Sequence, residues 1–198
     1  SGYERGVSFS HPWYTSAFRR IAIIVLDGEK RGTINRRLAD IGLPKVQKLR
    51  KKQKLPRRLP TAPVAIVWSP LPDGSPNVDA NEPRYFWPGK DWVDWVGTDF
   101  YSRYGSWKHL KKFYSVFAKG KNKPFALTEW GLWGEDQPKY VKKVFRFMKQ
   151  RDYADMLIYY QDFGSSNEFR IQNFPRSKKA LKKKIDSDRF PKSAKKYP

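Results

Sequence analysis

The sequence predicts an α/β fold in which helices cover a parallel sheet. Four short apolar runs have the length and composition of buried strands, at residues 64–69, 93–101, 124–130 and 156–161. Before, between and after them, apolar residues recur at helical spacing, and the runs end in polar or aromatic residues. Strands that are apolar on both faces are typical of parallel sheets covered by helices. We therefore predict a series of βα units.

Two helices are predicted ahead of the first strand. A loop ends at Pro12, and from Trp13 the apolar residues recur at helical spacing until Gly28 stops the pattern. A second, weaker helical pattern spans residues 33–43. Residues 44–60 are basic and interrupted by proline, which favours an insert on the surface.

Three further helices are expected among the later strands. The first ends at Gly120, the second begins near Pro138, where a helix tolerates proline best, and the third covers about residues 177–185. Residues 71–91 form a loop of a length that is usually functional or disordered. Its aromatic cluster at residues 85–87 favours packing or ligand contact over disorder.

The chain supplies half of the strands that a closed parallel barrel requires. A (β/α)8 barrel of the TIM type has eight strands, so the sequence predicts this type of fold with only about four C-terminal βα units. We expect a single domain over residues 1–190, containing the basic insert at about 44–60, and a basic tail at 191–198. Because a half-barrel leaves its edge strands unpaired, self-association is also expected.

Composition argues against several classes of protein. With 198 residues, of which 39% are hydrophobic and 16% aromatic, the chain can bury a core. It contains no run of about 18 apolar residues, so no membrane span is predicted, and Ser1 resembles a cut or processed end. The absence of cysteine excludes disulfides, and His11 and His109 lie in unrelated segments. We expect neither a metal nor an organic cofactor.

The net charge of +22 is concentrated in two segments of the chain. Residues 28–60 hold 12 Lys or Arg against two acids, and residues 170–198 hold 11 against two. Contact with an anionic polymer or cell surface, through residues 45–58 and 176–196, is one interpretation, and a solvated surface is the other. Aromatic residues do not interleave with these basic runs, which weakens the case for single-stranded nucleic acid.

The strand at residues 124–130 ends on one carboxylate, that of Glu129, between aromatic and glycine neighbours. Parallel α/β barrels place their chemistry at the carboxyl ends of their strands. Glu129 is therefore the leading catalytic candidate, and a helix cap or a solvated loop acid is the alternative. Tyr101 ends the neighbouring strand, where its hydroxyl would donate to Glu129 and keep the carboxylate ionised.

The strand ends carry the residue types that a sugar site needs. Glycosidases use two carboxylates, and sugar rings pack on aromatic faces while their hydroxyls bond to polar side chains. The candidate substrate contacts are Trp68, Asp99, Tyr101, Trp130, Trp133, Tyr160 and Gln161. Trp130 and Tyr160 fit equally well as filling of the barrel mouth, and Asp99 as a helix cap.

Three motifs carry a resemblance to a known family. They are Trp68-Ser69-Pro70, the run Tyr85-Phe86-Trp87-Pro88-Gly89 continuing through Val96-Gly97-Thr98-Asp99 to Tyr101, and Lys123-Pro124-Phe125-Ala126-Leu127-Thr128-Glu129-Trp130-Gly131. Over roughly residues 13–185, the chain resembles the second half of glycoside hydrolase family 26, the β-mannanases.

The resemblance implies a (β/α)8 barrel that hydrolyses β-linked polysaccharides or oligosaccharides with retention. Glu129 matches the nucleophile of the family, and Tyr101 matches the tyrosine that contacts it. The acid/base of the family lies in a His-Glu-x-Asn-Gly motif. Glu4 is the only equivalent that this chain offers, and the alternative is that the acid/base belongs to sequence that precedes this chain. Leu71 stands where the family has Asn. A secreted or cell-surface location is expected, and a non-catalytic carbohydrate- or polyanion-binding domain derived from a glycosidase barrel is the alternative function.

Overall fold

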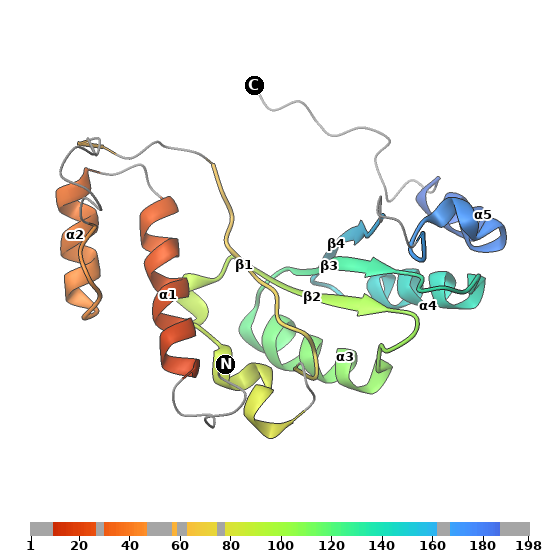
Figure 1. The fold of residues 1–198 in the computed structure, drawn as a ribbon, viewed down its shortest axis with the longest axis horizontal. Helices are drawn as coiled ribbons and strands as arrows, with labels where there is room; N and C mark the ends of the chain where they lie inside the picture. Colours follow the sequence, from red (N-terminus) through yellow and green to blue (C-terminus); the bar gives the residue numbers. More distant parts are fainter. Residues whose placement is uncertain are drawn as a thin grey trace. The chain divides into compact units, whose positions relative to one another are not determined.

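Figure 1 shows the fold of the chain in a computed structural model. The structure describes residues 10–26, 30–46, 57–58, 63–74, 78–161 and 167–186. The chain divides into two compact units, Ser1–Val96 and Gly97–Pro198, and each unit is described by itself. The expectation of one domain over residues 1–190 stays a prediction.

The described residues contain a four-stranded parallel sheet with the order β1-β2-β3-β4 (Figure 1). The strands are β1 (Val67–Trp68), β2 (Trp95–Tyr101), β3 (Phe125–Gly131) and β4 (Ala154–Tyr159). The α/β class with four strands and flanking helices is thereby confirmed. β1 and β4 are the outer strands of this order, and self-association through them stays a prediction.

β1 and β2 are shorter than their apolar runs, and β4 has the predicted length but begins two residues earlier. β1 holds two residues, and just before it the Asp94 side chain accepts from the Ile66 amide (2.7 Å), while the Asp94 amide donates to the Ile66 carbonyl (2.9 Å). β4 ends at Tyr159, so Tyr160 and Gln161 follow the strand. The apolar runs therefore predicted that the strands exist, but not the residues at which they begin and end.

In the first unit, helices α1 (Ser10–Val25) and α2 (Arg31–Asp40) lie side by side (Figure 1). Ile23, Ile34 and Leu38 are fully buried between them. The predicted loop end at Pro12 is wrong by a few residues, because Pro12 lies in the first turn of α1. Proline is tolerated there, since the amides of a first helical turn have no helical partner.

The loop at residues 71–91 carries short 3-10 turns within its described part. These turns are Asp79–Asn81, Pro83–Phe86 and, at its end, Lys90–Trp92. His11 of α1 joins them, because its ring stacks on Tyr85 (5.0 Å between centroids) and its Nε2 hydrogen-bonds the Ala80 carbonyl (2.7 Å). The expected packing of the aromatic cluster is thus observed.

In the second unit, aromatic side chains fill the space between the sheet and its helices. Helix α3 (Trp107–Phe113) continues through a π-helical turn (Tyr114–Ala118) and a 3-10 turn (Lys119–Lys121), and α4 is Pro138–Lys149. The Phe125 ring of β3 packs on Tyr114 and on Phe147 of α4, with centroids 5.4 and 6.2 Å away. This layer supports β3 from the helix side.

The last helix, α5 (Pro175–Ile185), follows the 3-10 turn Ile171–Asn173 and packs on α4. Its first turn is held by Asp136, which accepts from the Ser177 amide (2.8 Å) and the Ser177 hydroxyl (2.6 Å). Desolvation raises the pKa of Asp136, but these bonds and those from Arg176 lower it by more. An ionised carboxylate at a helix N-terminus is stabilising.

Candidate active site

A β-bulge in β3 turns two consecutive side chains toward the same side of the sheet. Between the pairs Leu127–Leu157 and Trp130–Tyr159, β3 advances by three residues and β4 by two. Asp99 and Tyr101 share one face of β2, since they are two residues apart. Thr128 bonds the first of them and Glu129 the second. The extra residue therefore brings Glu129 into line with Tyr101, as bulges do near active sites.

Tyr101 donates its hydroxyl to Glu129 Oε1. Burial, then the hydrogen bond and negative charge of Glu129, raise the pKa of Tyr101 far above its ordinary value. The phenol therefore stays protonated and acts as a permanent donor to the carboxylate. A charge-assisted bond of this kind fixes the position of its acceptor.

Asp99 is the second acid of the site. Its Oδ1 accepts a hydrogen bond from the Thr128 hydroxyl (3.3 Å). Burial, followed by the negative charge of Glu129, raises the pKa of Asp99, and the Thr128 bond offsets part of this. Two neighbouring carboxyl groups in different environments are typical of catalytic sites. The structure therefore joins Asp99 to Glu129 electrostatically, rather than to a helix end.

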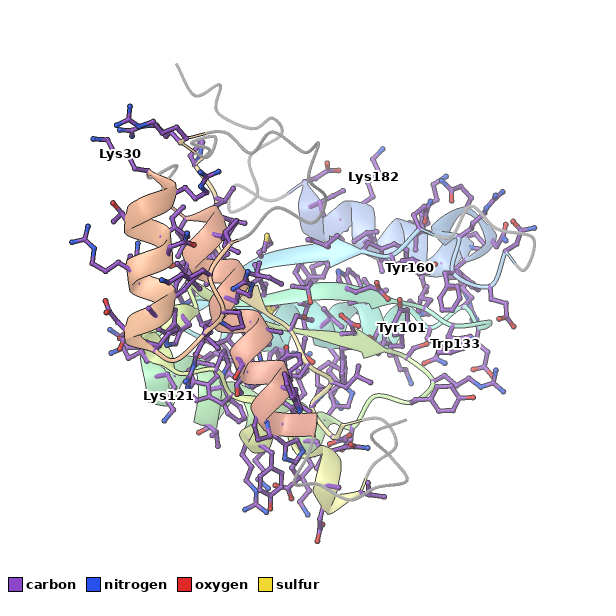
Figure 2. The ribbon with its side chains drawn as sticks, turned by 60° about the vertical axis from the view of Figure 1, so that its left-hand side comes forward. Lys30, Tyr101, Lys121, Trp133, Tyr160 and Lys182 are labelled. Atoms are coloured by element: carbon purple, nitrogen blue, oxygen red, sulfur yellow. The ribbon has the colours of Figure 1, made fainter. Side chains whose placement is uncertain are left out.

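Aromatic rings surround the Tyr101–Glu129 pair. The Tyr101 ring lies 5.3 Å from the Phe169 ring, 5.6 Å from Trp133 and 6.2 Å from Tyr160, all at steep angles. Figure 2 shows Tyr101, Trp133 and Tyr160 gathered at the carboxyl end of the strands. Tyr160 is 37% exposed and Tyr104, which lies 5.0 Å from Trp133, is 68% exposed. These rings form a partly exposed apolar surface beside Glu129.

The loop after β3 is held in place by polar contacts. The Trp133 amide donates to Ser102 Oγ (3.0 Å), and the Trp133 indole donates to Glu168 (3.2 Å). Nearby, the Tyr159 hydroxyl donates to the Phe169 carbonyl (2.9 Å), and burial raises the pKa of Tyr159 to about 12. Trp133 therefore presents its ring to the site from a fixed backbone position.

Sequence reasoning overlooked several residues of this arrangement. Thr128 lies inside the motif that contains Glu129 but is not among the predicted site residues. In a regular strand, consecutive side chains point to opposite faces of the sheet, so Thr128 would have faced away from the site. The others follow strands or sit in loops and carry no local signal: Ser102, Tyr104, Glu168 and Phe169.

The remaining candidates have other surroundings or are not described. Trp130 is 1% exposed and packs on Tyr159 at 5.0 Å and on Phe145 of α4, so it belongs to the core. Gln161 accepts from the Ile171 amide (3.1 Å), which is a structural contact. Trp68 is fully buried in the first unit, where its indole donates to the Phe86 carbonyl (3.0 Å). Glu4 lies outside the described residues.

Within the described residues, no group of three or more His, Asp or Glu side chains is arranged to hold a metal ion. In the same part of the chain, no helix has the length and apolar character needed to cross a membrane.

Two of the solved structures to which the chain is similar are mannanases. One is a GH26 β-mannanase from Bacteroides ovatus (TM-score 0.47, 21% identity, 64% of this chain and 38% of that one). The other is the catalytic domain of a GH26 endo-β-1,4-mannanase from Bacillus sp. JAMB-750 (TM-score 0.43, 15% identity, 63% and 38%). At these identities the likeness concerns the fold alone, and the chain spans 38% of the length of each. No protein-family profile and no curated protein matches the sequence.

Gly131→Ala is expected to disturb the Tyr101–Glu129 pair by crowding. A Cβ at Gly131 would meet Tyr101 Cε1 at 3.2 Å, so the ring must shift. Overpacking of this kind costs about 1 kcal/mol of the free energy of unfolding, measured by urea denaturation. Gly32→Ala is a comparison without crowding, because no atom lies within 4 Å of its Cβ, and inside α2 it should instead stabilise by up to about 1 kcal/mol. In a Tyr101→Ala background the Gly131→Ala penalty should vanish, and its persistence would show that the ring is not the cause.

Asp99→Asn is expected to remove a pH dependence of stability. Because the pKa of Asp99 is raised in the folded state, the folded state holds a proton that the unfolded state has released. The free energy of unfolding of the unmodified chain therefore falls as pH rises from about 4 through the raised pKa. The Asp99→Asn variant lacks this titrating group, so its free energy of unfolding should not show the fall. Asp155→Asn, at an exposed position of β4, should still show it. Parallel stability curves for Asp99→Asn and the unmodified chain, from pH 4 to 8, would contradict the assignment.

Proposed function

We propose that this chain carries the nucleophile half of a retaining glycoside hydrolase of the family 26 type, acting on β-mannan or a related β-linked polysaccharide. The observation that carries the proposal is the bond from a permanently protonated Tyr101 to Glu129 at the end of a parallel strand. The resemblance of residues 68–70, 85–101 and 123–131 to motifs of family 26 points to the same two residues.

The reaction has two steps with a covalent intermediate. Tyr101 holds Oε1 of Glu129, and Oε2 attacks the anomeric carbon as the bond to the leaving oxygen breaks. A second carboxylic acid, about 5–5.5 Å from Glu129, protonates that oxygen and then activates the water that hydrolyses the glycosyl ester. Glu4, or an acid from sequence preceding this chain, takes that role.

The surroundings of Glu129 suit a sugar ring. The faces of Trp133 and Tyr160 offer apolar surface on which C–H groups can pack. Asp99, held by Thr128 at 3.3 Å, is in reach of the same strand end and would accept from sugar hydroxyls. The proposal includes a secreted or cell-surface location, because polysaccharides of this kind are degraded outside the cell.

A second candidate is a non-catalytic carbohydrate-binding domain. It is favoured by the placement of the two carboxyl groups in the described site. Asp99 and Glu129 lie on adjacent strands of one sheet. A glycosidase requires two carboxyl groups that flank the glycosidic bond. On this alternative, the aromatic rings hold the glycan and no bond is cleaved.

An activated substrate separates the two candidates, because the first step of its cleavage needs no acid. A dinitrophenyl β-mannoside oligomer expels its leaving group without protonation, so the proposal expects the chain to release a burst of dinitrophenolate as the glycosyl ester forms. Glu129→Gln should lower the rate of this burst about a thousandfold or more while mannan oligosaccharide binding, measured by calorimetry, persists. The control is Glu135→Gln, at an exposed position of the same unit, which should leave both unchanged.

Two results would overturn the proposal. Equal dinitrophenolate release by Glu129→Gln and the unmodified chain would exclude Glu129 as the nucleophile. Tight mannan binding by the unmodified chain without any dinitrophenolate release would favour the binding domain.

A further inference from the structure

The helices of the second unit carry positive charge without any acid. α3, α4 and α5 together contain 12 Lys and two Arg, and none of the three contains Asp or Glu. Surface helices ordinarily mix both signs of charge. This bias includes α4, which lies outside the two basic segments noted in the sequence.

The charge of α4 lies on one face of the helix. The residues that point into the core are apolar: Tyr140, Val141, Val144, Phe145, Phe147 and Met148. The exposed positions between them are Lys139, Lys142, Lys143, Arg146 and Lys149. One cation or more per helical turn therefore faces solvent along the whole helix.

The neighbouring helices extend this surface. α5 packs on α4 and exposes Lys178, Lys179, Lys182, Lys183 and Lys184. Lys182 points away from the sheet in Figure 2. α3 adjoins α4 on its other side, where Lys143 Nζ lies 4.4 Å from the centre of the Trp107 ring. We call the exposed cations of these three helices the basic helix layer.

Concentrating like charges on packed helices is unfavourable in the absence of a counterion. Cations three and four residues apart repel each other along α4, as Lys139, Lys142 and Arg146 do. A polyanion laid over the layer would relieve this repulsion and release its own condensed counterions. The layer is therefore complementary to a polymer of negative charge.

We propose that the basic helix layer docks an acidic polysaccharide. Lys exceeds Arg by 12 to two, and Lys acts as a hydrated point charge without the planar fork that holds a single anionic group bidentately, so the layer suits charges spread along a polymer. The exposed face of α4 holds no aromatic side chain on which bases could stack. Its apolar face is buried in the core, so it has none to insert into a lipid surface. Carboxylate or sulfate groups spaced along a glycan remain as the matching chemistry.

The proposal does not depend on the role of Glu129. The layer is formed by helix faces, whereas Glu129 and Tyr101 lie at strand ends. An acidic polysaccharide docked on the helices would hold the chain within a polysaccharide matrix while leaving the strand ends accessible to a neutral glycan.

The test measures binding of the full chain to polygalacturonate, which carries carboxylates, and to heparin, which carries sulfates. Lys139→Gln/Lys142→Gln/Arg146→Gln removes three cations of the layer. Lys30→Gln/Arg36→Gln/Lys90→Gln is the matched control, because it removes the same charge from exposed positions of the first unit. At 50 mM salt, the α4 variant should bind at least one of the two polymers about tenfold more weakly and show a shallower salt dependence. The control should change affinity by less than about twofold.

The outcomes are distinct. Loss on polygalacturonate alone, on heparin alone or on both supports the proposal and identifies the anionic group. Equal losses in the α4 variant and the control would show that only net charge matters, which overturns it. Tighter binding at the same salt to duplex DNA, or to vesicles with anionic lipid, also overturns it. Circular dichroism of both variants verifies folding, and a Lys178→Gln/Lys182→Gln variant on α5 repeats the test if the α4 variant does not fold.

Discussion

The hydrogen bond from Tyr101 to Glu129 organises the second unit of the structure. It requires the bulge in β3, which brings Thr128 and Glu129 opposite Asp99 and Tyr101 of β2. It also requires a small residue at Gly131, because a Cβ there would press on the Tyr101 ring at 3.2 Å. Burial and the negative charge of Glu129 keep the phenol protonated. Local backbone irregularity and electrostatics thus act together to fix one carboxylate.

The same strand that presents Glu129 on one side anchors the core on the other. Trp130 is buried against Phe145 and Tyr159, while Phe125 packs on Tyr114 and Phe147. Rigid elements position functional groups more accurately than loops do. The aromatic content of the chain therefore serves two purposes, since some rings support β3 and others line the surface beside Glu129.

Much of this was predictable from sequence, because apolar runs and helical spacing reflect burial directly. The four strands, the start of α4 at Pro138 and the pairing of Tyr101 with Glu129 all followed from such patterns. The core position of Trp130 was not predictable, because an aromatic residue at a strand end fits either face until the bulge is known. Phe169 and Glu168 come from a loop distant in sequence, and only the fold brings them to Trp133. The Asp94 side chain, which accepts from the Ile66 amide just before β1, likewise could not be assigned that role from the apolar run.

The proposed role of Glu129 as the group that attacks the sugar, in place of Asp99, can be tested by trapping the covalent intermediate. A 2-deoxy-2-fluoro-glycosyl fluoride of a mannose oligosaccharide forms a long-lived ester with a retaining nucleophile, and it needs no acid to expel fluoride. After incubation of the chain with this reagent, peptide mapping by mass spectrometry identifies the modified residue. The account predicts one adduct, on Glu129. An adduct on Asp99, or no adduct at saturating reagent, would contradict it.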